Sequence, residues 1–441
     1  METNRDAGRK PAPLKTARVR HPRFLPPARN LPQIETLETR MKILYTTARF
    51  PYPPLRGDQV VPYFRIQHLA RKHEITLLSF VEGPQEMEYV RHLKPYCVEV
   101  HTVPLARWRS YASMSAGALS SLPLQVRYYS SSEYRRKLRE ILAKCKFDVI
   151  HTVLSRPANH TIGIEGTVKV CEMIDAVSLT MKRRADAAHW PAQWIWRREE
   201  ERMRHFEQRI CKSFDGVVVA SEVDRQELNA PNVTVVPVGA DVSPQPRPSP
   251  NGHKVVIFTG NFAYQPNQDA AIYLINEIWP QLRQLVPQAR LRIVGNSPGA
   301  KLLRVARQFP EVEVTGFVPD LRQHLLAADV AVAPVRSGGA GLHCKVLEAM
   351  ACGTPVVVSP MVTGIQGLPG EDFLVAADVS GYVQAIRSVL ENPQLATALS
   401  EKGRRLVVEN YSWEKTTQRL ELLYEELLYR RLQSTNHAHR N

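Results

Sequence analysis

The sequence predicts an α/β protein made of two doubly wound parallel-sheet domains. Three observations predict this fold class. Short apolar segments alternate with helical segments along most of the 441-residue chain, a pattern typical of parallel sheets covered by helices on both faces. Several of these apolar segments are followed by loops that contain glycine. A proline-rich stretch at 241–252 interrupts the series and divides the chain into two halves.

The composition narrows the class of protein. The length favours two or three domains, and a hydrophobic fraction of 44% is enough for sizeable cores. The formal net charge of +15 favours an anionic partner, such as a nucleotide, a nucleic acid or an acidic membrane surface. The six cysteines contain no Cys-x-x-Cys pair, so neither a zinc site nor a disulfide framework is indicated. The sequence shows no secretory signal and no apolar run near the ~20 residues of a membrane span, so we expect a cytoplasmic protein.

The first half begins with a basic, proline-rich segment at 1–40, which predicts a disordered arm. The alternative is that translation begins at Met41, where regular structure is predicted to start. A first domain is predicted over 41–240. Its strands are expected at 42–47, 74–80, 99–103, 147–153, 168–174, 216–221 and 233–238.

Four residues of this first domain are candidates for the site. A turn that ends at Gly57, followed by Asp58, lies between the first strand and an amphipathic helix at 59–72. His151 lies near the C-terminal end of its strand, where parallel sheets place ligand residues, although a structural role is the alternative. Asp175 follows another strand and either faces a cleft or caps the next helix, and the capping role is favoured.

The second half repeats strand and helix with regularity. After a linker at 241–253, a second domain is predicted over 254–405, and a final helix over 406–433. Strands are expected at 255–259, 291–294, 312–315, 330–335 and 356–358. Glycine-bearing loops follow the first four strands and should meet at one sheet edge, which predicts a ligand site. The candidate residues there are Gly260, Asn261, Gly295, Gly316, Phe317 and Arg336.

The fourth loop and the helix after it carry the most information. Gly338, Gly339 and Gly341 precede a helix that begins at Leu342. Glycines let the backbone approach a ligand closely, and the first turn of a helix offers unpaired N–H groups to an anion such as a diphosphate. This arrangement predicts a nucleotide site.

Two charged residues share one face of that helix. Lys345 can neutralise a phosphate, and the carboxylate of Glu348, three residues later, can accept hydrogen bonds from two vicinal hydroxyls of a ribose. An ordinary surface Lys–Glu pair is the alternative. The glycine loop before the helix favours the nucleotide site.

The segment Lys345-Val-Leu-Glu348-Ala-Met-Ala-Cys-Gly-Thr-Pro-Val-Val resembles the signature of the retaining family-4 glycosyltransferases. That family has the GT-B fold, in which two Rossmann-like domains flank a cleft. The resemblance spans roughly 41–430 and implies that the final helix crosses back to the first domain. It also implies that Glu348 contacts the donor ribose. The family has another glutamate eight positions earlier, which contacts the sugar, and Ala340 stands in its place here.

The resemblance assigns roles to other candidates as well. Gly57 matches the glycine of a turn that faces the donor diphosphate, and the base is expected near Phe317. Asn261 stands near the place of an Arg and a Lys that usually bind phosphate, so Lys345 and then Arg336 are expected to meet that charge. Backbone N–H groups from Gly339 to Leu342 are expected to hold the sugar. Family members often have histidines near the reacting centre in the region of His151.

The expected function is transfer of a sugar from a nucleotide diphosphate sugar to a hydroxyl of a lipid-linked or saccharide acceptor. The pattern resembles a bacterial exopolysaccharide-associated branch of the family. No Asp-x-Asp motif stands out, so no obligatory metal is expected. The alternatives are a sugar-nucleotide epimerase or hydrolase, and a non-catalytic binding protein that keeps the scaffold. No nucleic-acid-binding motif is present, so nucleic acid is not an expected partner.

Four tryptophans lie among basic residues in the first half, at 108, 190, 194 and 196. Tryptophan with Arg or Lys is typical of a lipid headgroup interface. The sequence therefore suggests a peripheral protein at an anionic membrane surface, on the inner face of the cytoplasmic membrane. The alternative is that these rings pack in a core or line a groove for a soluble acceptor.

Overall fold

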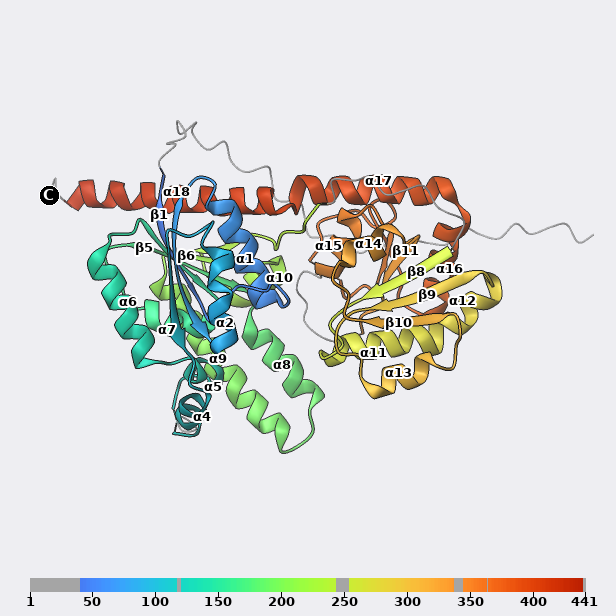
Figure 1. Ribbon diagram of the computed structural model, residues 1–441, viewed down its shortest axis with the longest axis horizontal. Helices are drawn as coiled ribbons and strands as arrows, with labels where there is room; N and C mark the ends of the chain where they lie inside the picture. Colours follow the sequence, from blue (N-terminus) through green and yellow to red (C-terminus); the bar gives the residue numbers. More distant parts are fainter. Residues whose placement is uncertain (1–39, 117–119, 243–253, 337–343, 363, 439–441) are drawn as a thin grey trace, which may run out of the picture. The chain divides into compact units, whose positions relative to one another are not determined.

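The computed structural model describes residues 40–116, 120–242, 254–336, 344–362 and 364–438. Two parallel sheets with helices packed against them make up this part of the chain (Figure 1). The predicted fold class, with two doubly wound parallel-sheet domains, is therefore confirmed.

The N-terminal sheet has seven parallel strands in the order β3-β2-β1-β4-β5-β6-β7. The strands are β1 Lys42–Thr47, β2 Glu74–Val81, β3 Glu99–Pro104, β4 Val149–Val153, β5 Val168–Ile174, β6 Gly216–Val219 and β7 Val233–Val235. The helices are α1 Gly57–Leu69, α2 Pro84–Glu88, α3 Val90–Leu93, α4 Arg107–Ala116, α5 Leu124–Tyr128, α6 Ser132–Lys144, α7 Ser155–Thr161, α8 Val177–Ala187, α9 Ala192–Ser213 and α10 Glu222–Leu228. Because β1 pairs with both β2 and β4, the strand order reverses at β1. Open α/β sheets bind ligands at such switch points.

The C-terminal sheet has six parallel strands in the order β10-β9-β8-β11-β12-β13. The strands are β8 Lys254–Thr259, β9 Ala289–Val294, β10 Val312–Gly316, β11 Val330–Ala333, β12 Val356–Val358 and β13 Leu374–Val375. The helices are α11 Gln265–Tyr273, α12 Trp279–Leu285, α13 Ala300–Ala306, α14 Leu321–Leu326, α15 Cys344–Ala351, α16 Val379–Glu391 and α17 Pro393–Asn410, and a π-helical turn, η1 Leu274–Ile278, joins α11 to α12. The order reverses at β8, which pairs with β9 and β11.

Alternate residues of the central strand β8 enter two different cores. Val256 and Phe258 pack with side chains of α11, η1, α12 and α16. Val255 and Ile257 point to the other face and pack with side chains of α15 and α17. A strand that is apolar at every position thus has helices on both sides, which is why its sequence shows no polar alternation.

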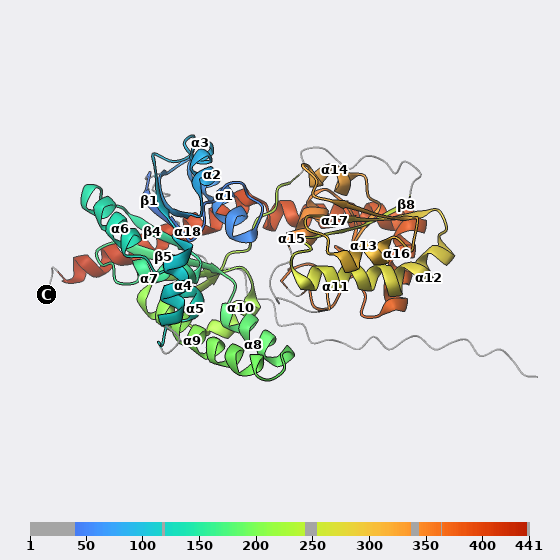
Figure 2. The same cartoon turned by 60° about the horizontal axis from the view of Figure 1, so that its bottom comes forward.

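The last helix, α18 Trp413–Ala438, packs against the N-terminal domain. It contacts α1 and β5, and Figures 1 and 2 both show it lying along the N-terminal sheet. Four of its buried residues, Leu420, Leu423, Tyr424 and Leu427, enter the same core as β1 and β2. Trp413 lies so close to Gly239 that a Cβ at that glycine would come within 2.3 Å of the indole ring. Any larger residue at position 239 would displace the start of α18.

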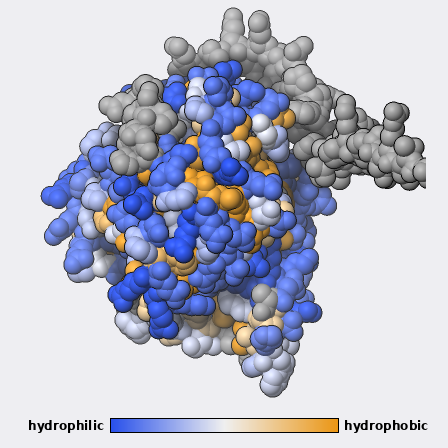
Figure 3. All heavy atoms as spheres, turned by 90° about the vertical axis from the view of Figure 1, so that its right-hand side faces the viewer, coloured by the Kyte–Doolittle hydropathy of each residue, from blue (hydrophilic) through white to orange (hydrophobic). Residues whose placement is uncertain are grey.

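The surface of the C-terminal domain seen from the α12 end is largely hydrophilic, with hydrophobic side chains visible between polar ones (Figure 3). This distribution is typical of amphipathic helices that bury one face. Within the described ranges, no helix combines the length and the apolar character that crossing a membrane requires.

Candidate functional site

Three glycine loops meet at the carboxyl edge of the C-terminal sheet. They follow the neighbouring strands β8, β9 and β10. Gly260 N donates to Val294 O at 3.0 Å, and Gly295 N donates to Gly316 O at 3.1 Å. Gly295 has φ +149°, and a Cβ there would lie 1.8 Å from the carbonyl oxygen of Gly260. The loops can approach one another this closely only because position 295 has no side chain.

Lys345 lies on α15 and is fixed by a residue that the sequence did not single out. Its Nζ donates a hydrogen bond to Asn267 Oδ1 and lies 4.9 Å from the centre of the Phe258 ring. Asn267 in turn donates from Nδ2 to the carbonyl oxygen of Asn261 at 2.9 Å. Desolvation lowers the pKa of Lys345 to about 8, although the nearby Glu348 opposes this shift. The ammonium is thus held in place by neutral groups.

Glu348 is the other half of this pair, and no described residue satisfies its carboxylate. The side chain is half-buried. Among the described residues, none donates a hydrogen bond to it and no ion pair with Lys345 forms. Burial raises the pKa of Glu348, and the charge of Lys345 only partly offsets this effect. A desolvated carboxylate without donors is poised to accept hydrogen bonds from a ligand.

The remaining candidates of the second domain lie as follows. The guanidinium of Arg336 stacks on Tyr273, 4.6 Å from the ring centre, and its side chain is exposed. Phe317, beside Gly316, is 60% exposed. Asn261 Oδ1 accepts from Ala263 N at 3.1 Å, so this amide stabilises its own turn. Gly338, Gly339, Gly341 and Leu342 lie outside the described residues, and their expected contacts stay predictions.

In the first domain, Gly57 and Asp58 open helix α1 next to the switch point. A Cβ at Gly57 would meet nothing within 4 Å, so no described protein atom requires a glycine there. Asp58 forms ion pairs with Arg49 at 3.5 Å and with Arg156 at 3.4 Å. Arg49 and Arg156 follow β1 and β4, and neither was a candidate in the sequence. Their positions two and three residues after the ends of two apolar strands could have indicated them.

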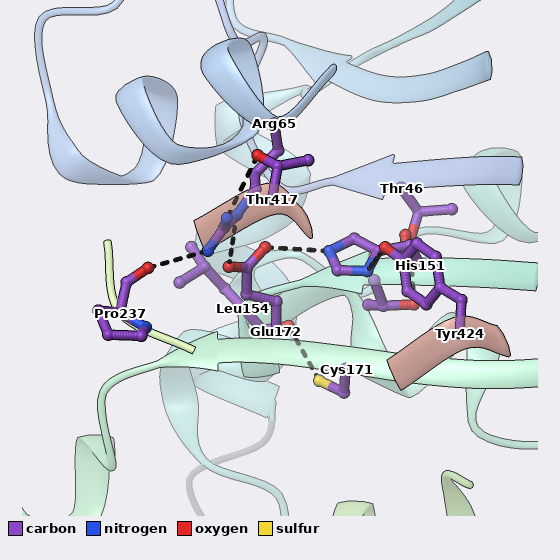
Figure 4. Close-up of polar contacts among 10 residues, drawn as sticks. Thr46, Arg65, His151, Leu154, Cys171, Glu172, Pro237, Thr417 and Tyr424 are labelled. Carbon is purple, nitrogen blue, oxygen red and sulfur yellow. Dashed lines mark hydrogen bonds and ion pairs between the residues drawn. The ribbon is translucent and has the colours of Figure 1, made fainter. Parts of the chain in front are cut away.

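His151 lies on β4 as expected, but it does not have the exposed position that a substrate contact requires. Its side chain is completely buried, and both ring nitrogens are occupied. Nε2 lies 3.1 Å from Glu172 Oε2, and Nδ1 lies 2.7 Å from the Tyr424 hydroxyl (Figure 4). The ring also stacks on Tyr45 at 4.4 Å. An imidazole with no exposed surface and no free nitrogen cannot contact a substrate, so the expected catalytic role of His151 is wrong.

The network around His151 is charged, and its imidazole, carboxylate and guanidinium groups all have partners within the protein. Arg65 is fully buried and lies 3.3 Å from Glu172 Oε1, and it also donates to Pro237 O at 3.0 Å. Burial lowers the pKa of His151, which favours the neutral ring. The geometry fits a proton on Nε2, donated to Glu172, while Nδ1 accepts from Tyr424. The charge of Arg65 holds the pKa of Glu172 below its ordinary value despite burial.

A metal centre was not expected. Within the described ranges, no three His, Cys, Asp or Glu side chains come together as a metal site would require. The expectation that no metal is obligatory stays a prediction.

The comparisons with known proteins agree with this geometry. Residues 253–392 match the family model described as glycosyl transferases group 1, and this segment includes the three glycine loops, Lys345 and Glu348.

Two curated relatives are mannosyltransferases. The GDP-mannose-dependent alpha-(1-6)-phosphatidylinositol monomannoside mannosyltransferase of Mycolicibacterium smegmatis is 32% identical over 181 residues, which cover 38% of this chain and 46% of the relative. The MMP alpha-(1->4)-mannosyltransferase of Mycolicibacterium hassiacum is 22% identical over 304 residues, which cover 64% of this chain and 72% of the relative. The chain thus spans about half the length of the first relative.

Solved structures extend the likeness to both domains. Sucrose-phosphate synthase from Thermosynechococcus elongatus superposes with a TM-score of 0.66 and 20% identity, over 88% of this chain and 100% of that one. Anabaena HepE in complex with UDP and glucose superposes with a TM-score of 0.62 and 14% identity, over 88% of this chain and 100% of that one. The expected GT-B fold is therefore confirmed, and so is the resemblance to GT-B glycosyltransferases of the family-4 type. The exopolysaccharide branch stays a prediction.

Proposed function

We propose that this chain, a GT-B protein with a group 1 glycosyltransferase domain at 253–392, transfers a sugar from a nucleotide diphosphate sugar to a hydroxyl acceptor. One observation carries the proposal. At the carboxyl edge of the C-terminal sheet, Lys345 is held by Asn267 while Glu348 keeps a carboxylate free of described partners. This pair offers a cation for a diphosphate and an acceptor for ribose hydroxyls.

In the reaction, the acceptor oxygen forms a bond to the anomeric carbon, the bond from that carbon to the diphosphate oxygen breaks, and the proton of the acceptor hydroxyl passes to an oxygen of the departing diphosphate. The diphosphate leaves with the electron pair and gains charge. Lys345 stabilises this charge at a desolvated position, where an electrostatic contact is stronger than in water. The resemblance implies retention of anomeric configuration. We expect activity to persist after EDTA treatment; loss restored by Mg²⁺ would contradict a metal-free mechanism.

The donor can be identified by thermal shift. A nucleotide that binds only the folded state raises the melting temperature by mass action. UDP-, GDP- and ADP-sugars should be compared, because one relative is named for GDP-mannose and one structure contains UDP and glucose. Product analysis with and without an acceptor then separates a transferase from an epimerase or hydrolase. No stabilisation by any of the three would count against the donor site.

A non-catalytic binding protein is the second candidate function. The observations that favour it are Ala340, where the family has a glutamate, and Asn261, whose side chain is used in its own turn. This candidate predicts that a sugar nucleotide stabilises the protein but that no acceptor tested receives sugar. Transfer to any acceptor excludes it.

We further propose a glycolipid or exopolysaccharide acceptor, reached at the cytoplasmic face of an anionic membrane. The first relative is named for a phosphatidylinositol acceptor. Trp190, in the connection between α8 and α9, is 85% exposed, and Trp194, near the start of α9, is 62% exposed. Trp108 on α4 is 70% exposed. Figure 1 shows α4 and the α8–α9 pair extending beyond the same end of the N-terminal sheet. Arg198 stacks on Trp194 at 5.9 Å, which places a cation beside an exposed ring.

Co-sedimentation with vesicles tests this surface. The protein should bind vesicles that contain anionic lipid, and salt should weaken binding, since each basic contact contributes about 1 kcal/mol. Replacing both Trp190 and Trp194 with Ala should reduce binding, whereas Leu285→Ala, an exposed apolar residue on α12, is the matched control. If the protein ignores anionic vesicles at low salt, the acceptor is soluble.

A further inference from the structure

Two turns at the carboxyl edge of the N-terminal sheet have an unusual backbone. Leu154 and Ile174 have φ of +70° and +67°, a region that L-residues, and β-branched ones above all, rarely adopt. They end the neighbouring parallel strands β4 and β5. After Ile174, Asp175 N donates back to Met173 O at 2.8 Å. The chain thus turns sharply at the end of β5, and Asp175 follows this turn.

Asp175 does not cap helix α8, contrary to the role that the sequence favours. The N-cap position is Ala176, and no side chain at that position caps the helix. Carboxylates from other helices occupy the helix start instead. Glu207 Oε1 accepts from Val177 N at 2.7 Å, and Asp224 Oδ1 accepts from Ala176 N at 2.9 Å.

Among the described residues, none therefore uses the Asp175 carboxylate. Its side chain is open to solvent, and no described residue donates a hydrogen bond to it or forms an ion pair with it. Protein packed around the turn still desolvates the group, and this effect together with the negative charge of Asp224 raises the pKa of Asp175 to about 6. The group is therefore mainly ionised at neutral pH. A partly desolvated carboxylate gains free energy from any ligand that supplies O–H donors.

We propose that Asp175 binds the acceptor substrate by accepting a hydrogen bond from one of its hydroxyls, which fixes the orientation of the attacking molecule. The ligand class is a polyol, such as a sugar or an inositol ring. This inference rests on the proposed glycosyl transfer and deepens it. It assigns the acceptor to the carboxyl edge of the N-terminal sheet, while Lys345 and Glu348 serve the donor at the edge of the other sheet.

The test compares Asp175→Asn with Asp186→Asn. Asp186 is an exposed carboxylate on α8, the helix that follows Asp175, and serves as the matched control. For Asp175→Asn we expect the KM for the acceptor to rise about tenfold, the scale of one lost hydrogen bond to a charged group. The KM for the donor and the thermal shift caused by the nucleotide should stay within about twofold of wild type. Asp175→Glu, which keeps the charge, should recover part of the acceptor affinity.

The outcomes separate this inference from the proposed function. An unchanged acceptor KM in folded Asp175→Asn overturns the assignment. An equal loss of donor and acceptor affinity means that Asp175 maintains the turn and does not bind the acceptor, which overturns it too. If Asp175→Asn does not fold, Asp175→Glu and Asp175→Ser provide the same comparison. If wild-type protein transfers sugar to no acceptor, the proposed function fails, and this inference fails with it.

Discussion

Two charged groups of residues in this chain use the same chemistry with opposite results. Beneath α18, Arg65 and Glu172 are fully paired, and His151 and Tyr424 complete the network. At the edge of the C-terminal sheet, Lys345 has a neutral partner, and Glu348 has no described donor. In the first group the charges of Arg65 and Glu172 are paired within the protein, whereas the Glu348 carboxylate of the second group has no described donor. Charge alone therefore does not distinguish a candidate site from a structural ion pair; the difference lies in whether described residues pair the carboxylate.

The largest expected effect is on stability, from removal of Arg65. Arg65→Met leaves the buried carboxylate of Glu172 without its counter-ion. Breaking a buried pair in this way costs about 3–5 kcal/mol in the free energy of unfolding. Urea unfolding of the N-terminal domain measures the loss. Arg65→Met combined with Glu172→Gln should be less destabilised than Arg65→Met alone, and a loss below about 1 kcal/mol would show that the network is not structural.

The second effect is on donor binding. Glu348→Ala should weaken binding of the nucleotide sugar by about 1.5–3 kcal/mol, the scale of hydrogen bonds to a charged group, with the fold intact. Glu348→Gln should be milder because one acceptor oxygen remains. Titration calorimetry measures the affinity, and Glu401→Gln, an exposed residue on α17, is the control. Unchanged donor affinity in folded Glu348→Ala would remove the ribose assignment.

The comparison becomes sharper when Glu172→Gln is measured beside Glu348→Gln. The change at Glu172 should lower stability and spare donor affinity, because that carboxylate is enclosed by protein donors. The change at Glu348 should lower donor affinity and leave stability unchanged. If both variants lose the same property, the distinction between the two groups fails.

Lys345 tests the catalytic side of the proposal. Lys345→Met should lower kcat by about 10²-fold, and more than it weakens donor binding, because the diphosphate gains charge toward the transition state. Steady-state kinetics on this variant measure the loss in kcat, and titration with the nucleotide sugar measures the loss in donor affinity. Equal losses would mean that Lys345 only binds the donor.

The smallest expected effect is a pH dependence of donor affinity. Desolvation lowers the pKa of Lys345 to about 8, so in the free protein the ammonium loses its proton as the pH rises through that value. An anionic donor favours the protonated form, and its affinity should therefore be highest below pH 8 and fall above it. Lys345→Arg keeps its charge throughout this range and should abolish the decline. A decline that persists in Lys345→Arg must come from another group.

The lowered pKa of Lys345 has the opposite consequence for the stability of the protein without donor. The folded protein binds fewer protons at Lys345 than the unfolded chain does between about pH 8 and the ordinary lysine pKa of 10.5. The contribution of this residue to the free energy of unfolding therefore rises with pH across that interval. Donor affinity and intrinsic stability should change in opposite directions, which distinguishes a local effect at Lys345 from general alkaline unfolding.

The sequence by itself determined the features that depend on neighbours along the chain. Apolar strands such as β8, with helices between them, indicated two parallel sheets. Residues three positions apart on a helix share a face, which placed Lys345 and Glu348 together. Glycine after each of several strands indicated one loop-bearing sheet edge, and the structure brings Gly260, Gly295 and Gly316 to that edge. Each of these features follows from local periodicity or from the conformational freedom of a single residue type.

Only the tertiary structure decided which polar groups are already satisfied. The partner of Lys345 is 78 positions away, that of Arg65 is 107 away, and the hydroxyl that occupies His151 is 273 away. Nothing local to His151 distinguishes a buried histidine with two partners from one that faces a substrate. Asp175 shows the reverse case, because carboxylates from α9 and α10 satisfy the helix start that it was expected to cap. Whether a side chain is free depends on groups brought together by folding, and no pattern along the chain records that.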